Sequence, residues 1–341
     1  MAESDQRDFL IIRLGSLGDI VHTIPAVAAL RHGFPKAKID WVVEEKWSPL
    51  VQMVTCVDEV IPVQRTFSGQ VACVRRLRRG HYGCAVDFQG LYKSALLGWL
   101  GGARRRIGRA RDAAREPGAA RFYTETVSPQ GRHVAEMSLS VAKKAGADSD
   151  GGMEFPLCVS QSARQALTEK LAAEGIADYF VVSPGGGWIS KCWPAERYGK
   201  LCEELWRRRG LRAVVNAGPA EGELAQRVVR ASGEAKPLVL APGLVELAAL
   251  LACAQLVVAA DTGPLHLAAA LGTRVVALFG VTDAERNGPL PRGRVVCNAP
   301  AGVAPSQRGD YERGNEYSSE MMGLGVEQVL VACEEELGGQ R

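Results

Sequence analysis

The chain of 341 residues has no apolar run long enough to cross a bilayer. Its longest, residues 247–260, contains 14 residues, includes Gln255 and ends before Asp261. A membrane-spanning helix needs about 20 residues. The first eight residues, MAESDQRD, are polar and acidic instead of basic and then apolar, which argues against a secretory signal peptide. These absences predict a cytoplasmic protein.

Several familiar binding patterns are also missing. The nine cysteines are odd in number and show no CxxC pair, so buried thiols in a reducing compartment are expected instead of disulfides or a metal site. The chain has no Walker A loop and no aromatic-rich RNA motif. The first glycine turn reads GxxGD instead of GxGxxG, which argues against a dinucleotide site, although Glu44 and Glu45 stand where a ribose-binding acid would be found.

What is present is the composition of an ordinary globular protein, with 47% apolar and 23% charged residues. The length predicts two domains. The net charge of +3 hides an asymmetry, because residues 65–121 hold 13 Arg or Lys against three acids. This basic segment is either a set of solvated helix faces or a surface for an anionic partner, such as a phosphorylated glycolipid, an acidic sugar, a membrane or RNA.

The first half alternates between strands and helices. A buried apolar strand at residues 9–13, a glycine turn, a helix at 19–31 and a strand at 39–43 make a strand, helix, strand unit. Such units build a doubly wound parallel sheet. Further strands are expected at 58–63, 84–88 and 104–108, with helices near 70–79, 91–101 and 133–145.

Residues 146–160 turn to Gly, Asp, Ser and Pro and read as a linker before a helix at 160–174, so the domain boundary is placed near residue 170. The second half repeats the alternation. The fold class is therefore α/β, with two Rossmann-like domains whose strands point their carboxyl ends into a central cleft, where ligands bind. The strands are expected within 179–187, 211–218, 236–240, 255–261 and 273–280, with helices at 194–209, 220–232, 244–253 and 264–271.

The first loop of interest is GSLGD. Gly15 and Gly18 let the backbone turn tightly, while Ser16 and Asp19 stand at the start of a helix. An aspartate there is often only a helix cap. Across a cleft from a phosphate site, the same carboxylate could take a proton from a hydroxyl nucleophile.

The loop DTGPLH outlines an anion site. Thr262 or Gly263 can cap the helix that follows, and the first turn directs N–H groups and the positive end of the dipole outward. His266 either contacts a phosphate or bonds locally. Asp261 would repel a diphosphate, so it faces sugar hydroxyls, braces its own loop or caps the helix.

Two further loops follow strands of the second half. Consecutive glycines at 185–187 allow a ligand to approach the backbone, and Lys191 lies at a reach that suits a phosphate, or is simply solvated. Glu221 either binds the paired hydroxyls of a ribose or is favoured at its position by the helix dipole.

In this order, the segments IIRLGSLGDIVHTIPAVAALR, IDWVVEE, DFQGLYKSALL, SPGGGWISKCWP, AGPAEGE and AADTGPLHLAAALGTRVVALFGVTDAERNGP closely resemble the lipopolysaccharide heptosyltransferases of glycosyltransferase family 9. The resemblance covers about residues 9–290, and the subgroup that adds the first heptose is the most similar. Two motifs depart from the family: GGGWIS precedes Lys191 where hydroxyl residues are common, and VTDA replaces Pro-Thr-Asp-Pro or a close variant.

The resemblance implies a GT-B fold, with an acceptor-binding domain at 1–170 and a nucleotide-sugar-binding domain at 171–341. It implies an inverting, metal-independent transfer of heptose from ADP-heptose to the lipopolysaccharide inner core, on Kdo-lipid A or heptosyl-Kdo, with no cofactor. The alternatives are a transferase for another nucleotide sugar, a nicotinamide-dependent oxidoreductase and a non-catalytic module for anionic surfaces. The sequence leaves open whether the terminal helix, 325–337, packs back on the first domain.

By motif match, Asp19 resembles the family's base and Lys191 its diphosphate-binding lysine. The expected partners are an ADP-sugar, an anionic glycolipid and the cytoplasmic face of the inner membrane, without nucleic acid. The exact acceptor, the linkage, the oligomeric state and the role of residues 299–323 stay open. The expected donor-binding residues are Gly186, Gly187, Glu221, Asp261, Thr262, Gly263 and His266, and the expected acceptor-binding residues are Ser16, Gly18, Lys93, Arg104, Arg109 and Arg115.

Overall fold

The computed structural model describes residues 8–297 and 316–338, and the chain divides into two compact units between Cys158 and Val159. The division falls earlier than the expected residue 170. Helix α7 (Gln161–Ala173) packs on α10 (Leu244–Cys253) and so belongs to the second unit. Residues 1–7, which make up most of the polar N-terminal segment MAESDQRD, and most of 299–323 lie outside the described residues.

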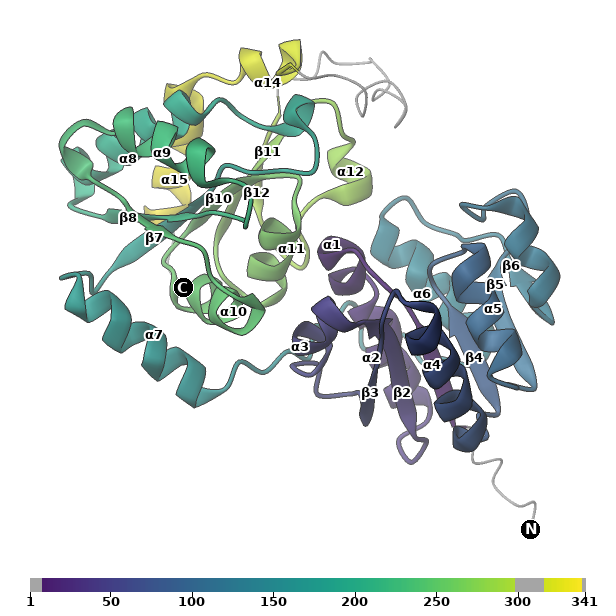
Figure 1. Ribbon diagram of the computed structural model, residues 1–341. Coiled ribbons are helices and arrows are strands. Elements are labelled where there is room, and N and C mark those ends of the chain that lie inside the picture. The colour runs from purple at the N-terminus through teal and green to yellow at the C-terminus, as the bar shows by residue number, and fades with distance from the viewer. Residues whose placement is uncertain (1–7, 298–315, 339–341) are drawn as a thin grey trace. The chain divides into compact units, whose positions relative to one another are not determined.

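The first unit contains a six-stranded parallel sheet with strand order β3-β2-β1-β4-β5-β6 (Figure 1). The order reverses direction between β1 and β4, because β1 pairs with β2 on one side and with β4 on the other. This confirms the doubly wound sheet that the sequence predicts. The strands are β1 (Phe9–Ile12), β2 (Ile39–Glu44), β3 (Glu59–Val63), β4 (Cys84–Asp87), β5 (Arg105–Arg109) and β6 (Glu125–Val127).

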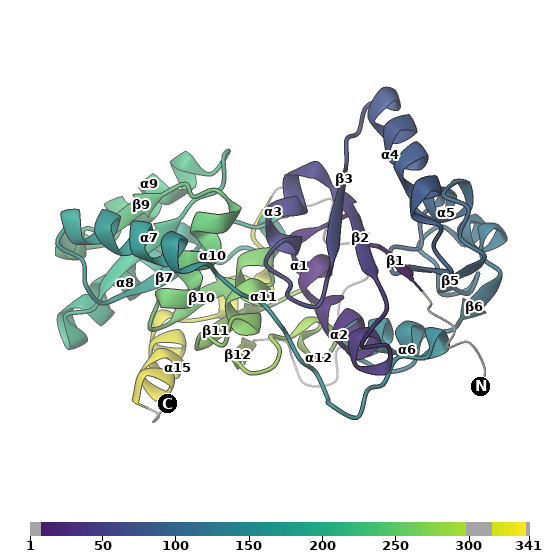
Figure 2. The same ribbon diagram turned by 90° about the horizontal axis from the view of Figure 1, so that it is seen from below.

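Helices cover both faces of this sheet (Figure 2). Alternate residues of a strand point to opposite faces. Leu10 therefore joins a cluster with Leu77 and Leu97 on one face, while the Phe9 ring lies 4.9 Å from the Phe34 ring on the other. The first face carries α4 (Phe67–Gly80) and α5 (Tyr92–Leu100), and the second carries α2 (Ile24–Gly33) and α6 (Val134–Ala145). Shorter pieces are α1 (Leu17–Val21), α3 (Ser48–Val51) and the 3-10 turns η1 (Glu45–Trp47) and η2 (Pro117–Phe122).

The helix expected at 19–31 is in fact two helices, α1 and α2. A continuous helix would require Pro25 to donate a hydrogen bond to the carbonyl of Val21, which proline cannot do, and its ring would clash with that carbonyl. The chain therefore breaks at His22 and Thr23, and Pro25 lies in the first turn of α2, where no donor is needed.

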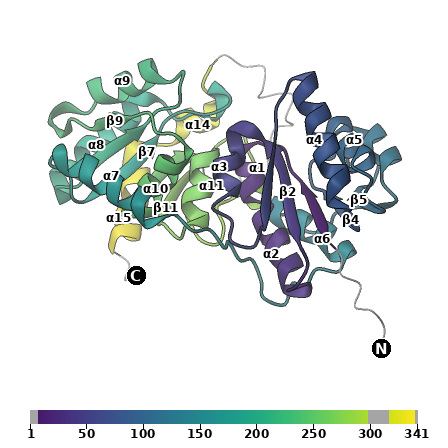
Figure 3. The same ribbon diagram turned by 60° about the horizontal axis from the view of Figure 1, so that its bottom comes forward.

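The second unit repeats the arrangement of the first. Its sheet runs β12-β11-β10-β7-β8-β9, so the order again reverses direction beside its first strand, here between β7 and β10. Helices α8, α9 and α15 lie over one face, and α7, α10 and α11 over the other (Figure 3). The strands are β7 (Tyr179–Ser183), β8 (Arg212–Asn216), β9 (Leu238–Leu240), β10 (Val257–Ala260), β11 (Val275–Phe279) and β12 (Arg294–Cys297). The remaining helices are η3 (Ile189–Lys191), α8 (Ala195–Arg209), α9 (Gly222–Arg230), η4 (Gly233–Ala235), α11 (Gly263–Ala270), α12 (Ala284–Asn287), α14 (Ser319–Gly323) and α15 (Val326–Gly338).

The terminal helix α15 completes the core of the second unit. Val329, Leu330 and Cys333 are buried in one cluster with Tyr198 of α8, and α15 packs on α8, β11 and β12. The buried face of this helix thus packs within its own unit.

All nine cysteines lie within the described residues as thiols, and six of them are buried. In the described part of the chain, no helix has the length and apolar character needed to span a bilayer.

Candidate active site

The fold brings two loops of the first unit together at the point where the strand order reverses. These loops follow β1 and β4, and they are the place where doubly wound sheets bind ligands. Arg13 Nη1 donates to the carbonyl oxygen of Phe88 at 2.5 Å, and the backbone N–H of Leu14 donates to Gln89 Oε1 at 3.1 Å. The two loops are therefore tied to each other directly behind Asp19.

Asp19 is held in a fixed orientation at the start of α1. Its Oδ1 lies 2.6 Å from Arg13 Nη2. Its Oδ2 accepts from the backbone N–H of Ser16 at 3.2 Å and from the Ser16 hydroxyl at 3.3 Å. Burial alone would raise the pKa of Asp19, but the Arg13 charge and the Ser16 hydrogen bonds outweigh it and lower the pKa. With 41% of its side chain exposed, Asp19 is an ionised carboxylate that remains open to a substrate.

Arg13 is a site residue that sequence reasoning missed. Its side chain is only 11% exposed and serves Asp19 and the loop after β4 together. The available signal was a cation directly after an apolar strand, at the carboxyl end where ligand sites form. The presence of glycine at position 15 has a steric explanation. A Cβ there would lie 2.7 Å from Trp47 Nε1, so only glycine permits this approach.

Three of the expected acceptor-binding cations lie at the same edge of the sheet as Asp19. Gly90 has φ +69°, and a Cβ on it would lie 3.7 Å from Arg109 Cδ and 3.5 Å from the backbone N of Arg115. Lys93 lies in the first turn of α5, three residues after Gly90. The structure therefore gathers Lys93, Arg109 and Arg115 beside the loop after β4, together with Ser16 and Gly18 near Asp19.

Arg104 does not belong to this group, contrary to expectation. It precedes β5 and lies at the amino end of the strand, whereas Arg109 ends it. At about 3.3 Å per residue, the two Cα atoms are roughly 16 Å apart. The neighbours of Arg104 are structural, since Arg105 pairs with Glu125 at 2.8 Å and Arg106 donates to backbone carbonyls.

Glu44 ends β2 and binds two cations. Arg65 Nη2 lies 2.8 Å from its Oε2, and Lys93 Nζ lies 3.3 Å from its Oε1. Burial would raise the pKa of Glu44, but the hydrogen bonds from Arg65 and Lys93 lower it. Glu44 therefore neutralises part of the positive charge at this edge.

In the second unit, the loops after β7 and β10 meet at the corresponding reversal. Lys191 Nζ lies 3.1 Å from Asp261 Oδ2, and His266 Nε2 lies 3.0 Å from Asp261 Oδ1. The side chains of all three are at least four-fifths buried. Burial would raise the pKa of Asp261, but the hydrogen bond and charge of His266, and then Lys191, hold it well below its usual value. Of the roles considered for Asp261, bracing its own loop is the one that this geometry supports.

The start of α11 presents the groups of an anion site. Thr262 is the N-cap in extended conformation, Gly263 is the first helical residue and Pro264 lies in the first turn. The N–H groups of this turn have no acceptor within the helix. Among the described residues, the buried hydroxyl of Thr262 has no hydrogen-bond partner, and a buried group in that state costs about 1 to 3 kcal/mol. A ligand that bonds to this hydroxyl would remove that cost.

The glycine run lies against both Glu221 and Thr262. A Cβ on Gly185 would overlap the Glu221 carboxylate, and a Cβ on Gly186 would lie 3.6 Å from Thr262 Cγ2. A Cβ on Gly187 would meet nothing within 4 Å. A Cβ on Gly186 would also lie 2.9 Å from Cys192 Sγ, so Gly185 and Gly186 both lie close to neighbouring side chains. Glu221 Oε2 accepts from the backbone N–H of Gly218 at 2.7 Å.

The expected donor-binding residues thus come together at one edge of the second sheet. They offer a cation, a helix N-terminus and a free hydroxyl, which suit a diphosphate, and a carboxylate, which suits vicinal hydroxyls. In the two described stretches of chain, no group of three or more His, Cys, Asp or Glu residues could hold a metal ion.

Comparison with known proteins identifies the family of the chain. Residues 71–313 match the family model described as Glycosyltransferase family 9 (heptosyltransferase). Lipopolysaccharide heptosyltransferase 1 of Pseudomonas aeruginosa is 33% identical over 310 residues, which cover 87% of this chain and 85% of that protein.

Solved structures extend the similarity to the whole fold. The E. coli heptosyltransferase WaaC with ADP-2-deoxy-2-fluoro heptose is 28% identical, with a TM-score of 0.75, and the match covers 96% of this chain and 99% of that one. A family 9 glycosyl transferase from Veillonella parvula shares the fold, with a TM-score of 0.86 at 24% identity over 98% of both chains. The fold is GT-B, as expected. The chain therefore belongs to glycosyltransferase family 9, the heptosyltransferase family, and is a glycosyltransferase.

Proposed function

We propose that this enzyme transfers heptose from ADP-heptose to a sugar of the lipopolysaccharide inner core, with inversion at the anomeric carbon. The observation that carries the proposal is the buried network of Lys191, Asp261 and His266 beside the N-terminus of α11. The relatives support it: those compared above are lipopolysaccharide heptosyltransferase 1 and a heptosyltransferase with an ADP-heptose analogue.

In this proposal the second unit binds the donor. Lys191 and the first turn of α11 meet the diphosphate, and the Thr262 hydroxyl completes its shell. Glu221 accepts from the ribose hydroxyls. Asp261 stays out of contact with the phosphates and keeps Lys191 and His266 in place, so the cation is oriented before the nucleotide arrives.

Asp19 then acts as the general base. It takes the proton of the acceptor hydroxyl, whose oxygen attacks the anomeric carbon opposite the departing ADP, so one displacement inverts the centre. ADP leaves as an anion and needs charge stabilisation more than a proton. Removing one preorganised donor of this kind typically raises a barrier by about 3 kcal/mol. In this proposal, Asp19 acts on the acceptor hydroxyl and Lys191 acts on the departing diphosphate.

The direct test is Asp19→Asn, which keeps size and removes the base. We expect kcat to fall by about 10² to 10⁴ fold, because that is the usual contribution of a general base. The Kd for ADP, measured by calorimetry, should stay within twofold of wild type. Asp150→Asn, at an exposed aspartate of the same unit, is the matched control. Wild-type turnover in Asp19→Asn would rule out the assigned role.

A further inference from the structure

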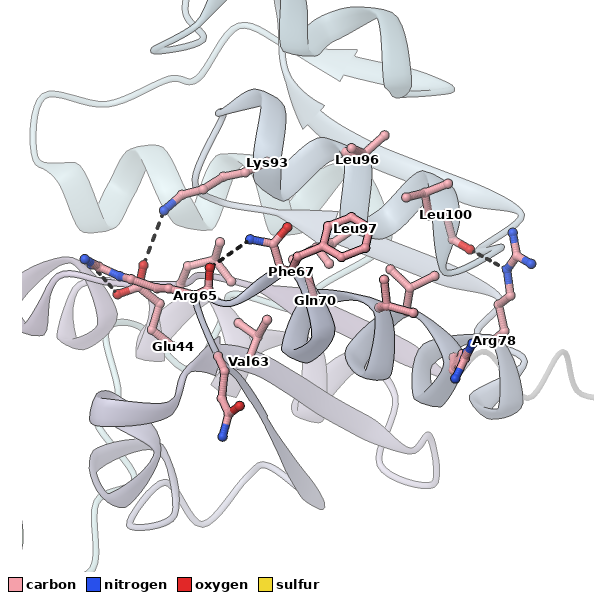
Figure 4. A pocket seen from close by; sticks show the side chains of 15 residues that line it. Glu44, Val63, Arg65, Phe67, Gln70, Arg78, Lys93, Leu96, Leu97 and Leu100 are labelled. Carbon is pink, nitrogen blue, oxygen red and sulfur yellow. Dashed lines mark hydrogen bonds and ion pairs between the residues drawn. The ribbon is translucent and has the colours of Figure 1, made fainter.

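A groove lies between α4 and α5 on the first unit. Its volume is 450 Å³, and side chains of both helices line it (Figure 4). One wall carries Leu96, Leu97 and Leu100 of α5, and the other carries Phe67 and Val74 of α4. The groove is therefore mainly apolar along its length.

The mouth of this groove exposes large apolar side chains. Phe67 is 84% exposed and Leu96 is 37% exposed. On the outer face of α5, Tyr92 and Trp99 are 48% and 50% exposed, and helical spacing places both on the same side as Leu96. Large apolar side chains that gather on an exposed face often mark a site of interaction with a protein or a membrane.

The charged residues that line the groove are mostly basic. Arg65, Arg75, Arg78 and Lys93 line it, and Glu44 is the one acid among its lining residues. Glu44 pairs with Arg65 and Lys93 at one end, as Figure 4 shows. At the other end, Arg78 Nε donates to the carbonyl oxygen of Leu100 at 2.8 Å. In the described part of the chain, Arg75 has no ion-pair partner, so this end keeps its positive charge.

The groove also adjoins the loop that carries Asp19. Leu14 lines the groove and lies in that loop, and its carbonyl oxygen accepts from the backbone N–H of Glu44 at 3.1 Å. A ligand in the groove is thus continuous with the expected acceptor site.

We propose that the α4–α5 face docks on an anionic lipid bilayer, with one acyl chain in the groove and lipid phosphates on Arg75 and Arg78. Aromatic side chains beside cations are the combination that anchors proteins at the interface of such membranes. A protein partner fits less well, since charges are depleted at the centre of protein interfaces. The inference rests on the proposed function, because an acceptor carried by a membrane lipid requires the enzyme to work at that membrane.

The first test measures sedimentation of the full chain with vesicles of phosphatidylglycerol and phosphatidylcholine. The double variant Phe67→Ser/Arg75→Glu should lower the partition coefficient about tenfold or more, since each interfacial cation and each inserted ring contributes several-fold. Trp206→Ser/Lys200→Glu, at exposed positions of α8, is the matched control and should change it less than twofold. Equal partition of the two double variants would overturn the proposal, as would binding of wild type to pure phosphatidylcholine with the same affinity.

The second test asks whether acyl chains reach the exposed face of α5 beside the groove. Vesicles whose acyl chains carry bromine should quench the fluorescence of Trp99, and Trp99→Phe should abolish that quenching while Trp206→Phe leaves it unchanged. Quenching that survives in Trp99→Phe would contradict the assignment of this face.

The failure of this proposal is distinguishable from failure of the proposed function. The vesicles contain neither donor nor acceptor, so binding reports on docking alone. Phe67→Ser/Arg75→Glu should transfer heptose to a water-soluble, deacylated acceptor at a rate within twofold of wild type. A large loss on this soluble acceptor would place the two residues in the sugar-binding site and refute docking as their role.

Discussion

At the scale of single residues, the notable arrangement is the carboxylate of Asp19, the proposed base, paired with a buried arginine. Arg13 both orients Asp19 and keeps it ionised, against the effect of burial. A base with a lowered pKa is weaker but is fully deprotonated at any pH near neutrality. Arg13 is thus a positioning residue. It makes Asp19 a weaker base, but it holds the Asp19 carboxylate ionised and in a fixed orientation.

The pH dependence of turnover tests this arrangement. In wild type, the lowered pKa of Asp19 means that kcat should hold its value down to about pH 4, near the ordinary carboxyl pKa, and fall only below it. In Arg13→Met, the charge and hydrogen bond of Arg13 are lost while the Ser16 hydrogen bonds remain, so the pKa of Asp19 should rise and the acidic limb should move to higher pH. A profile of kcat against pH measures both.

Arg13→Lys is the control, because it restores a positive charge without the two-pronged geometry, and it should recover part of the acidic limb. An acidic limb that stays in place in Arg13→Met would mean that Arg13 has no influence on the ionisation of the base.

The hydroxyl of Thr262 gives a second prediction at this scale. Because this buried hydroxyl has no partner in the described residues, Thr262→Val should leave the free energy of unfolding unchanged or raise it by about 1 kcal/mol. The Kd for ADP should rise about fivefold, as expected for one lost hydrogen bond. Denaturant unfolding and calorimetry measure the two quantities. Lower stability with unchanged ADP affinity would make the hydroxyl structural.

At the scale of elements, the arginines at the two ends of β5 lie at opposite edges of the sheet. Arg109 and the following Arg115 lie at the carboxyl edge of the sheet, and Arg104 lies at the amino edge. We expect Arg109→Met and Arg115→Met each to raise the KM for an anionic acceptor about tenfold, since charge-assisted hydrogen bonds are lost. The Kd for ADP should not change.

Arg104→Met is the matched control in the same short segment, and it should leave the acceptor KM within twofold of wild type. An equal rise in KM for Arg104→Met would show that overall charge matters in this segment and position does not.

The sequence predicts most elements because the central strands are buried on both faces and read as continuous apolar runs. It misses the edge strands β6 and β12, which are short and largely exposed, as Arg294 and Val295 illustrate. It also overlooks the effect of Pro25, which divides one expected helix into α1 and α2.

The candidate site follows the same logic. Motifs at strand ends locate Asp19, Lys191 and the start of α11, since parallel strands place those ends at one edge. The sequence groups Arg104 with Arg109 because the two are near neighbours in the chain, although an extended strand separates them in space. The close approach of the Glu221 carboxylate to Gly185 and of Cys192 Sγ to Gly186 arises from tertiary packing, which no local pattern reveals.

At the scale of the whole molecule, each unit has its own sheet and its own buried core. The expected donor-binding residues all belong to the second unit. Scanning calorimetry should therefore show one transition that rises with ADP or ADP-heptose and one that does not. At a ligand concentration a hundredfold above Kd, stabilisation is about 2.7 kcal/mol, or roughly 5 to 10 °C for a unit of this size.

A panel of nucleotide sugars at equal concentration gives this experiment its specificity. ADP-heptose should raise the melting temperature more than UDP-glucose or GDP-mannose does. A larger rise with a UDP-sugar or a GDP-sugar would replace the proposed donor, and a rise confined to the other transition would move nucleotide binding to the first unit.

Because the strands of each sheet are parallel, the turns that precede them lie at the edge opposite the candidate binding residues. The turns before β2 and β8, around Lys36 and Gly210, are exposed and hold none of the residues assigned to binding or chemistry. A pair of fluorescent dyes attached at these turns, after replacement of the exposed thiols Cys158, Cys253 and Cys297, would report on domain motion during turnover without disturbing catalysis.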